Sequence, residues 1–148
     1  MFTGMLHVGF TVADLDAAGR FYQELFGAPP RVRRIFDAPY TGEQVGYPGA
    51  RLDVAHFDVP GSPAFLELIQ YLEPVGAPVD IETCNPGTGH LCLATDDIEA
   101  AFARLVELGA VPRSTAPVAI TSGPNEGRRV VYFRDPQGLT IEVMEARR

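Results

Sequence analysis

The chain has 148 residues, the size of one ordinary domain, and 46% of them are hydrophobic and 21% charged. Its formal charge of −7 argues against a surface that binds nucleic acid or anionic membranes. No apolar run approaches the ~20 residues that span a bilayer, and the N-terminal residues lack the pattern of a signal peptide. We therefore expect a cytoplasmic protein whose two cysteines, Cys84 and Cys92, are free thiols.

The first half of the chain predicts a strand, a helix and three more strands. Residues 5–12 alternate in the period-2 manner of a strand, and Asp14 follows where a helix N-cap is expected. A helix is predicted over about 15–26, and Gly27 is placed to end it. The three strands that follow are predicted at about 31–37, 50–59 and 64–72.

The second half predicts the same order of elements. A strand over 90–95 leads to an N-cap at Asp97, a helix over about 98–108 and a terminating Gly109. Three strands are again predicted, at about 117–122, 129–134 and 139–145. The segment 73–89 between the halves is rich in Pro and Gly and has the composition of a linker.

The two halves are also related in sequence. At a constant offset of 83 positions they share a histidine, an aspartate, an Ala-Ala pair, a glutamate and a leucine. The matched positions are His7/His90, Asp14/Asp97, Ala17/Ala100, Ala18/Ala101, Glu24/Glu107 and Leu25/Leu108. We therefore predict an α+β fold of two βαβββ repeats, about 5–72 and 90–146, in one domain covering 1–148. The repeats would form a curved mixed sheet, a cup with its helices on the outer face.

Each repeat offers one histidine and one glutamate on the same face of its strands. In Phe65-Leu66-Glu67-Leu68 and Thr140-Ile141-Glu142-Val143 the apolar residues point toward the helices, so Glu67 and Glu142 point away from them. By the same alternation, His7 and His90 lie on the faces of their first strands that point away from the helices. If the repeats pair symmetrically, these four side chains meet.

Two imidazoles and two carboxylates suit a divalent cation such as Zn, Ni, Co, Mn or Fe. We therefore predict one metal ion per site, held by His7, Glu67, His90 and Glu142, with two positions of an octahedron open to substrate. His56 has no histidine partner in the other repeat and is not assigned as a ligand. Cys92 faces the same cavity and is interpreted as a small residue of its wall.

Three stretches carry a resemblance to a known family. They are His7-Val-Gly-Phe-Thr-Val-Ala-Asp, Gly89-His-Leu-Cys-Leu-Ala-Thr-Asp and Tyr132-Phe-Arg-Asp-Pro-Gln-Gly-Leu-Thr-Ile-Glu142. They resemble the vicinal oxygen chelate superfamily of glyoxalase I, methylmalonyl-CoA epimerase, extradiol dioxygenases and the fosfomycin and bleomycin resistance proteins. The resemblance implies the same four ligands. A set with Glu67 is most similar to glyoxalase I, because the epimerases commonly carry Gln at that position.

The resemblance also implies a reaction class. We expect a divalent-metal-dependent lyase or isomerase of the glyoxalase I or acyl-CoA epimerase type, which stabilises an enediolate or enolate and shuttles a carbon-bound proton. Glu142 is the first candidate for the base and Glu67 the second, while an epimerase would need another base, for which Glu43 is available. The alternatives are an Fe(II) ring-cleaving dioxygenase and a non-catalytic drug- or metabolite-binding resistance protein. The expected partners are a small-molecule substrate and a second copy of the chain, with repeats paired within one chain or across a homodimer.

Overall fold

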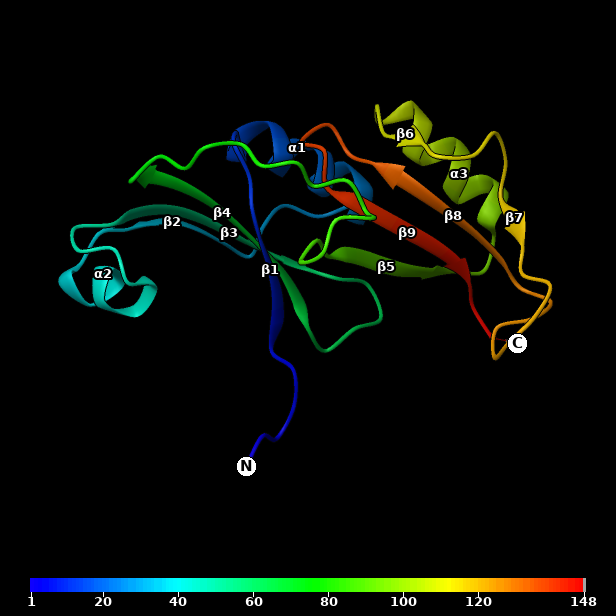
Figure 1. The fold of residues 1–148 in the computed structure, drawn as a ribbon, viewed down its shortest axis with the longest axis horizontal. Helices are drawn as coiled ribbons and strands as arrows, with labels where there is room; N and C mark the ends of the chain where they lie inside the picture. The colour runs from blue at the N-terminus through cyan, green and yellow to red at the C-terminus, as the bar shows by residue number, and fades with distance from the viewer. Residues whose placement is uncertain (148) are drawn as a thin grey trace. The chain divides into compact units, whose positions relative to one another are not determined.

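The computed structural model describes residues 1–147, which form two compact units, Met1–Pro78 and a second unit that begins at Val79 (Figure 1). Three helices and nine strands occur within the described residues. Each unit has its own mixed sheet with a helix on one face. This agrees with the predicted α+β fold of two repeats. No helix among residues 1–147 has the length and apolarity to cross a membrane.

The first unit has four strands in the order β1-β4-β3-β2, in which β1 runs parallel to β4 and the other pairs are antiparallel. Helix α1 begins at Asp14, whose carboxylate accepts a hydrogen bond from Ala17 N at 2.9 Å, and ends at Gly27 with φ of 76°. The elements are β1 (His7–Thr11), α1 (Leu15–Phe26), β2 (Val32–Phe36), α2 (Pro39–Val45), β3 (Arg51–Asp58) and β4 (Phe65–Glu73).

The second unit repeats this topology with the order β5-β9-β8-β6, and β7 pairs with β8. Strand β5 is parallel to β9, as β1 is to β4. Helix α3 begins at Asp97, which accepts from Ala100 N at 3.0 Å, and Gly109 follows its end with φ of 89°. The elements are β5 (His90–Thr95), α3 (Ile98–Glu107), β6 (Val111–Pro112), β7 (Val118–Ala119), β8 (Arg129–Arg134) and β9 (Thr140–Glu145).

Each hydrophobic core lies between the helix and one face of the sheet. In the first unit, Leu66 and Leu68 of β4 are fully buried, and Phe57 of β3 lies 6.2 Å from the ring of Tyr22 in α1. In the second unit the corresponding buried residues of β9 and α3 are Ile141, Val143, Ile98 and Leu105. Burial of one such side chain contributes roughly 1.5–3 kcal/mol. The alternation along β4 and β9 therefore points Glu67 and Glu142 away from the helices, as predicted.

The sequence did not predict helix α2, which has no helical counterpart between β6 and β8 in the described part of the second repeat. Val45 of α2 packs on a cluster that includes Leu52, Val54, Ile69 and Tyr71. Val54 pairs with Ile69 and Leu52 with Tyr71, in the register that also pairs His56 with Glu67, so this cluster shares the face of Glu67. Helix α2 therefore covers part of the face that carries the predicted ligands. The strand predicted at 117–122 contains only Val118–Ala119, and β6 was missed.

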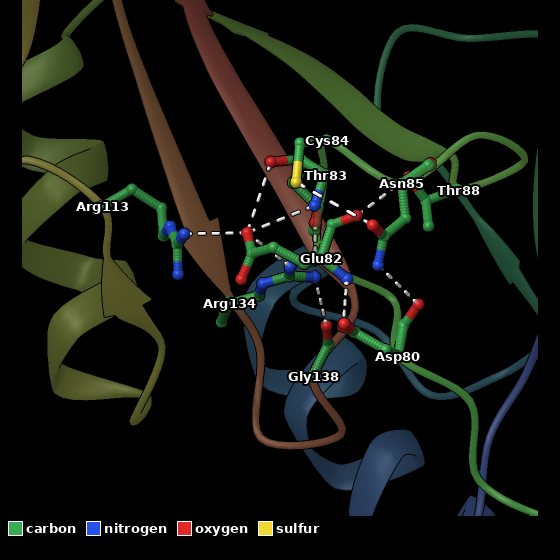
Figure 2. A network of polar contacts seen from close by, with 10 residues as sticks. Asp80, Glu82, Thr83, Cys84, Asn85, Thr88, Arg113, Arg134 and Gly138 are labelled. Carbon is green, nitrogen blue, oxygen red and sulfur yellow. Dashed lines mark hydrogen bonds and ion pairs between the residues drawn. The ribbon is translucent and has the colours of Figure 1, made fainter.

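Part of the predicted linker is bound to the second unit by a polar network (Figure 2). Glu82 accepts from Arg113 at 2.8 Å and lies 3.1 Å from Arg134, and Arg134 also donates to Gly138 O and Thr140 Oγ1 at 2.8 Å. Arg134 and Thr140 are cross-strand partners two residues from Tyr132 and Glu142. The network therefore borders the ligand-bearing face of the second sheet.

Candidate metal site

In the first unit, the structure brings His7 and Glu67 together. His7 lies on the edge strand β1, and its Nε2 is 3.5 Å from Glu67 Oε2 on β4. Gly9 is the direct neighbour of Glu67 across the two strands, and a Cβ at Gly9 would come within 3.3 Å of that same oxygen. Glycine at this position therefore leaves space beside Glu67 Oε2.

His56 also contacts Glu67. It is the cross-strand partner of Glu67 on β3, and its Nε2 lies 2.9 Å from Glu67 Oε1. The rings of His56 and His7 both lie against Phe65, with centroids 4.6 Å and 4.9 Å from that of Phe65. The two carboxylate oxygens of Glu67 thus face two different imidazoles.

In the second unit, His90 on the edge strand β5 pairs with Glu142 on β9. His90 Nε2 is 3.0 Å from Glu142 Oε2, and the Glu142 side chain is only 10% exposed. Cys92 and Tyr132 flank Glu142 across the strands on either side, in the places that Gly9 and His56 occupy beside Glu67. The two predicted ligand pairs are therefore built in the same register.

The neighbours of Glu142 are held in their neutral forms. Burial, and then the negative charge of Glu142 and a hydrogen bond to it, raise the pKa of Cys92 to about 11. Burial is also the first cause that raises the pKa of the Tyr132 phenol, followed by the charge of Glu142 and a hydrogen bond to its carboxylate. At neutral pH, Tyr132 therefore keeps its phenol proton beside Glu142.

The separations within each pair fit shared coordination of one ion. Two adjacent donors of an octahedron with bonds of about 2.1 Å lie about 3.0 Å apart, and those of a tetrahedron about 3.4 Å apart. The 3.0 Å separation of His90 and Glu142 matches the octahedral value, whereas the 3.5 Å separation of His7 and Glu67 is wider than that and close to the tetrahedral value. Among residues 1–147 no group of three or more His, Cys, Asp or Glu side chains is placed to hold a metal ion.

Two features of the site were not predicted. Comparison of the repeats did not place His56 against Glu67 or Tyr132 against Glu142, because cross-strand register depends on turns that this comparison does not determine. Pairing the predicted third and fourth strands of each repeat would have found both. Glu43, the candidate second base, lies in α2 with an exposed side chain. Both cysteines are free, as predicted.

Comparison with known proteins agrees with this architecture. The model of the Glyoxalase/Bleomycin resistance protein/Dioxygenase superfamily matches residues 4–143. The chain belongs to this superfamily. A glyoxalase family protein from Bacillus cereus superposes with a TM-score of 0.84 at 22% identity, covering 98% of this chain and 95% of that one. This likeness supports the glyoxalase fold.

Relatives within the superfamily include enzymes. The chain is 31% identical over 141 residues to a 2-epi-5-epi-valiolone epimerase from Actinomyces sp., covering 93% of this chain and 76% of the relative. It is also 31% identical over 144 residues to a probable chloroplastic lactoylglutathione lyase from Arabidopsis thaliana, covering 95% of this chain. The chain spans only 35% of the length of that lyase.

Proposed function

We propose that this protein is a divalent-metal-dependent lyase or isomerase of the glyoxalase superfamily, with His7, Glu67, His90 and Glu142 as the protein ligands of one cation. The observation that carries the proposal is the matched His–Glu pair on the face away from the helices in each repeat, at donor separations of 3.5 Å and 3.0 Å. Imidazole and carboxylate together suit Zn, Ni, Co, Mn or Fe. A cation there would act as a Lewis acid that stabilises negative charge on adjacent substrate oxygens.

The carboxylates supply the proton transfer. We assign Glu142 as the base that takes a proton from carbon and returns it, with Glu67 as the second candidate. Glu142 is bordered by the neutral Cys92 and Tyr132, and its side chain is almost buried, so little water surrounds the carboxylate. Return of the proton to the neighbouring carbon gives an isomerisation, and return to the opposite face of the same carbon gives an epimerisation. Glu43 stays the candidate second base for the latter.

The substrate class follows from this chemistry and from the relatives. A small molecule with a carbonyl beside a second oxygen would be able to bind such a cation through both oxygens. The names of the two relatives, an epimerase and a lactoylglutathione lyase, make hydroxyketones and hemithioacetals the substrates to test first. We also propose that the His7–Glu67 pair and the His90–Glu142 pair, the two half-sites, come together either within one chain or across a homodimer. The protein is proposed to be cytoplasmic.

Metal binding is the first test. Protein stripped with a chelator should bind about one equivalent of Ni²⁺, Co²⁺, Zn²⁺ or Mn²⁺ per chain in calorimetry, whether the half-sites join within a chain or across a dimer. His7→Ala and His90→Ala should each abolish tight binding. Glu73→Gln, at the exposed end of β4, is the matched control and should bind as the parent does. The absence of binding for all four ions would refute the metal-dependent function.

Solvent exchange tests the base. With metal and substrate present in deuterated water, the parent should introduce deuterium at the carbon beside the carbonyl. Glu142→Gln should retain metal and lose this exchange by at least ~100-fold, the lower end of the contribution of general acid–base catalysis. A Glu142→Gln variant with bound metal and full exchange would contradict the assignment and direct attention to Glu67→Gln.

A further inference from the structure

The two oxygens of Glu67 are engaged by different residues. Oε2 faces His7 on the edge strand at 3.5 Å, whereas Oε1 lies 2.9 Å from His56 Nε2 on the interior strand β3. The second distance is that of a hydrogen bond, and the first is too long for one. Because Glu67 Oε1 accepts, His56 Nε2 must carry the hydrogen and donate it.

We propose that His56 is a positioning residue for the metal site, which holds Glu67 by Oε1 so that Oε2 is directed at the cation. This inference rests on the proposed function. The histidine uses its Nε2 for the carboxylate, and its ring packs against Phe65 with centroids 4.6 Å apart. Its side chain is 18% exposed, compared with 40% for His7. His56 therefore supports a ligand, whereas the more open His7 offers its Nε2 to the ion.

The space around Glu67 agrees with different roles for its two carboxylate oxygens. Gly9 lies directly opposite Glu67 on β1, and a Cβ there would approach Oε2 to 3.3 Å. The oxygen that is not bonded to His56 is thus the one that borders the position without a side chain. A carboxylate fixed by one oxygen and open at the other binds an ion through one oxygen, and it loses less side-chain entropy when it does so.

The second repeat has a donor at the same position. Tyr132 is the cross-strand partner of Glu142 on β8, as His56 is of Glu67 on β3. Its phenol therefore lies beside the Glu142 carboxylate, where its O–H is available as a donor. The donors are chemically different, an imidazole N–H and a phenol O–H, but they occupy the same place relative to the carboxylate. The comparison explains His56, which has no histidine counterpart in the second repeat.

The test removes the hydrogen-bond donor of His56 and keeps an aromatic ring at that position. His56→Phe retains an aromatic side chain beside Phe65 but cannot donate, whereas His56→Gln can still donate an amide N–H to Glu67. Metal affinity of stripped protein, measured by competition with a chromophoric chelator, should fall by about 10–100-fold in His56→Phe, as for other residues that support a ligand. His56→Gln should recover most of the loss. Tyr71→Phe, on the same face of β4, should bind as the parent does.

A spectroscopic measurement separates positioning from ligation. The visible spectrum of the Co²⁺ form should show His56→Gln with the coordination of the parent and His56→Phe with altered bands at saturating Co²⁺. His56→Leu repeats the measurement if urea denaturation shows that the phenylalanine variant does not fold.

Three outcomes would overturn the proposal, and the first two are distinct from failure of the proposed function. Unchanged affinity and spectrum in His56→Phe, together with loss of binding in His7→Ala, would show that His56 does not position Glu67 while the metal site stands. Loss of binding in both His56→Phe and His56→Gln, as complete as in His7→Ala, would make His56 a ligand. A parent protein that binds none of the four ions would remove the proposed function and this inference with it.

Discussion

Substitution of alanine for glycine should have opposite effects in the two helices of the first unit. Gly42 lies in α2, and a Cβ there would come 2.8 Å from Tyr47 O, 2.9 Å from Gly49 N and 3.2 Å from Pro48 Cα. All three atoms are backbone, so no side chain can turn aside. Gly19 lies in α1, where the nearest atoms to a Cβ would be 3.8 Å and 3.9 Å away, an ordinary contact.

The magnitudes follow from these distances. Alanine gains about 0.5–1 kcal/mol over glycine inside a helix, and at Gly19 nothing opposes that gain. At Gly42 the overpacking costs about 1–3 kcal/mol, which offsets the gain and leaves a net loss of up to about 2.5 kcal/mol. The two variants should therefore differ by about 2 kcal/mol in the free energy of unfolding. Because both positions lie in the first unit, the second unit contributes equally to both measurements.

Urea denaturation followed by circular dichroism at 222 nm measures this difference. The parent midpoint should lie between those of the two variants, with similar denaturant slopes. A Gly42→Ala variant as stable as the parent would show that α2 does not approach the 47–49 turn as closely as described.

Other predictions concern the cores, a helix cap and a thiol. Leu66→Ala and Ile141→Ala, at fully buried positions, should each cost about 2–5 kcal/mol in urea denaturation, and a cost below ~1 kcal/mol would contradict the packing of the helices on these faces. Asp97→Ala removes the acceptor for Ala100 N and should cost about 1 kcal/mol, most of which Asp97→Ser recovers; equal stability of all three proteins would argue against the cap. Both thiols are exposed, but the raised pKa of Cys92 lowers its thiolate fraction. In metal-free protein, iodoacetamide at pH 8 should therefore alkylate Cys92 much more slowly than Cys84, and the rate at Cys92 should rise until the pH approaches 11. Mass spectrometry of the two peptides checks this, and equal rates at pH 8 would contradict the environment described for Glu142.

The elements that the sequence predicted well are those with a strong local signal and a second copy. Leu66 and Leu68 on either side of Glu67 define the buried and ligand-bearing faces of β4, and Ile141 and Val143 do so around Glu142. Asp14 and Asp97 mark the helix starts because a carboxylate N-cap depends on residues only three positions away.

The features that the sequence did not predict depend on contacts between distant residues. Helix α2 contains Pro39 and Gly42, which favour a loop, and it is stabilised by packing of Val45 on the sheet. The contact of His56 with Glu67 requires the register between β3 and β4. That register is determined by the turn between the two strands and by the buried pairs beside it.

The division of the ligands into two pairs has a thermodynamic consequence. Under the proposed coordination, an ion that requires both His–Glu pairs stabilises both units at once, by about 2.7 kcal/mol when its free concentration is 100 times the dissociation constant. Bound metal would then make the unfolding of the two units cooperative. A substitution in the core of the first unit, such as Leu66→Ala, would lower the resistance of α3 to hydrogen exchange in the metal-loaded protein but not after chelation. Under the proposed coordination, the cation would therefore stabilise two units that each have their own core.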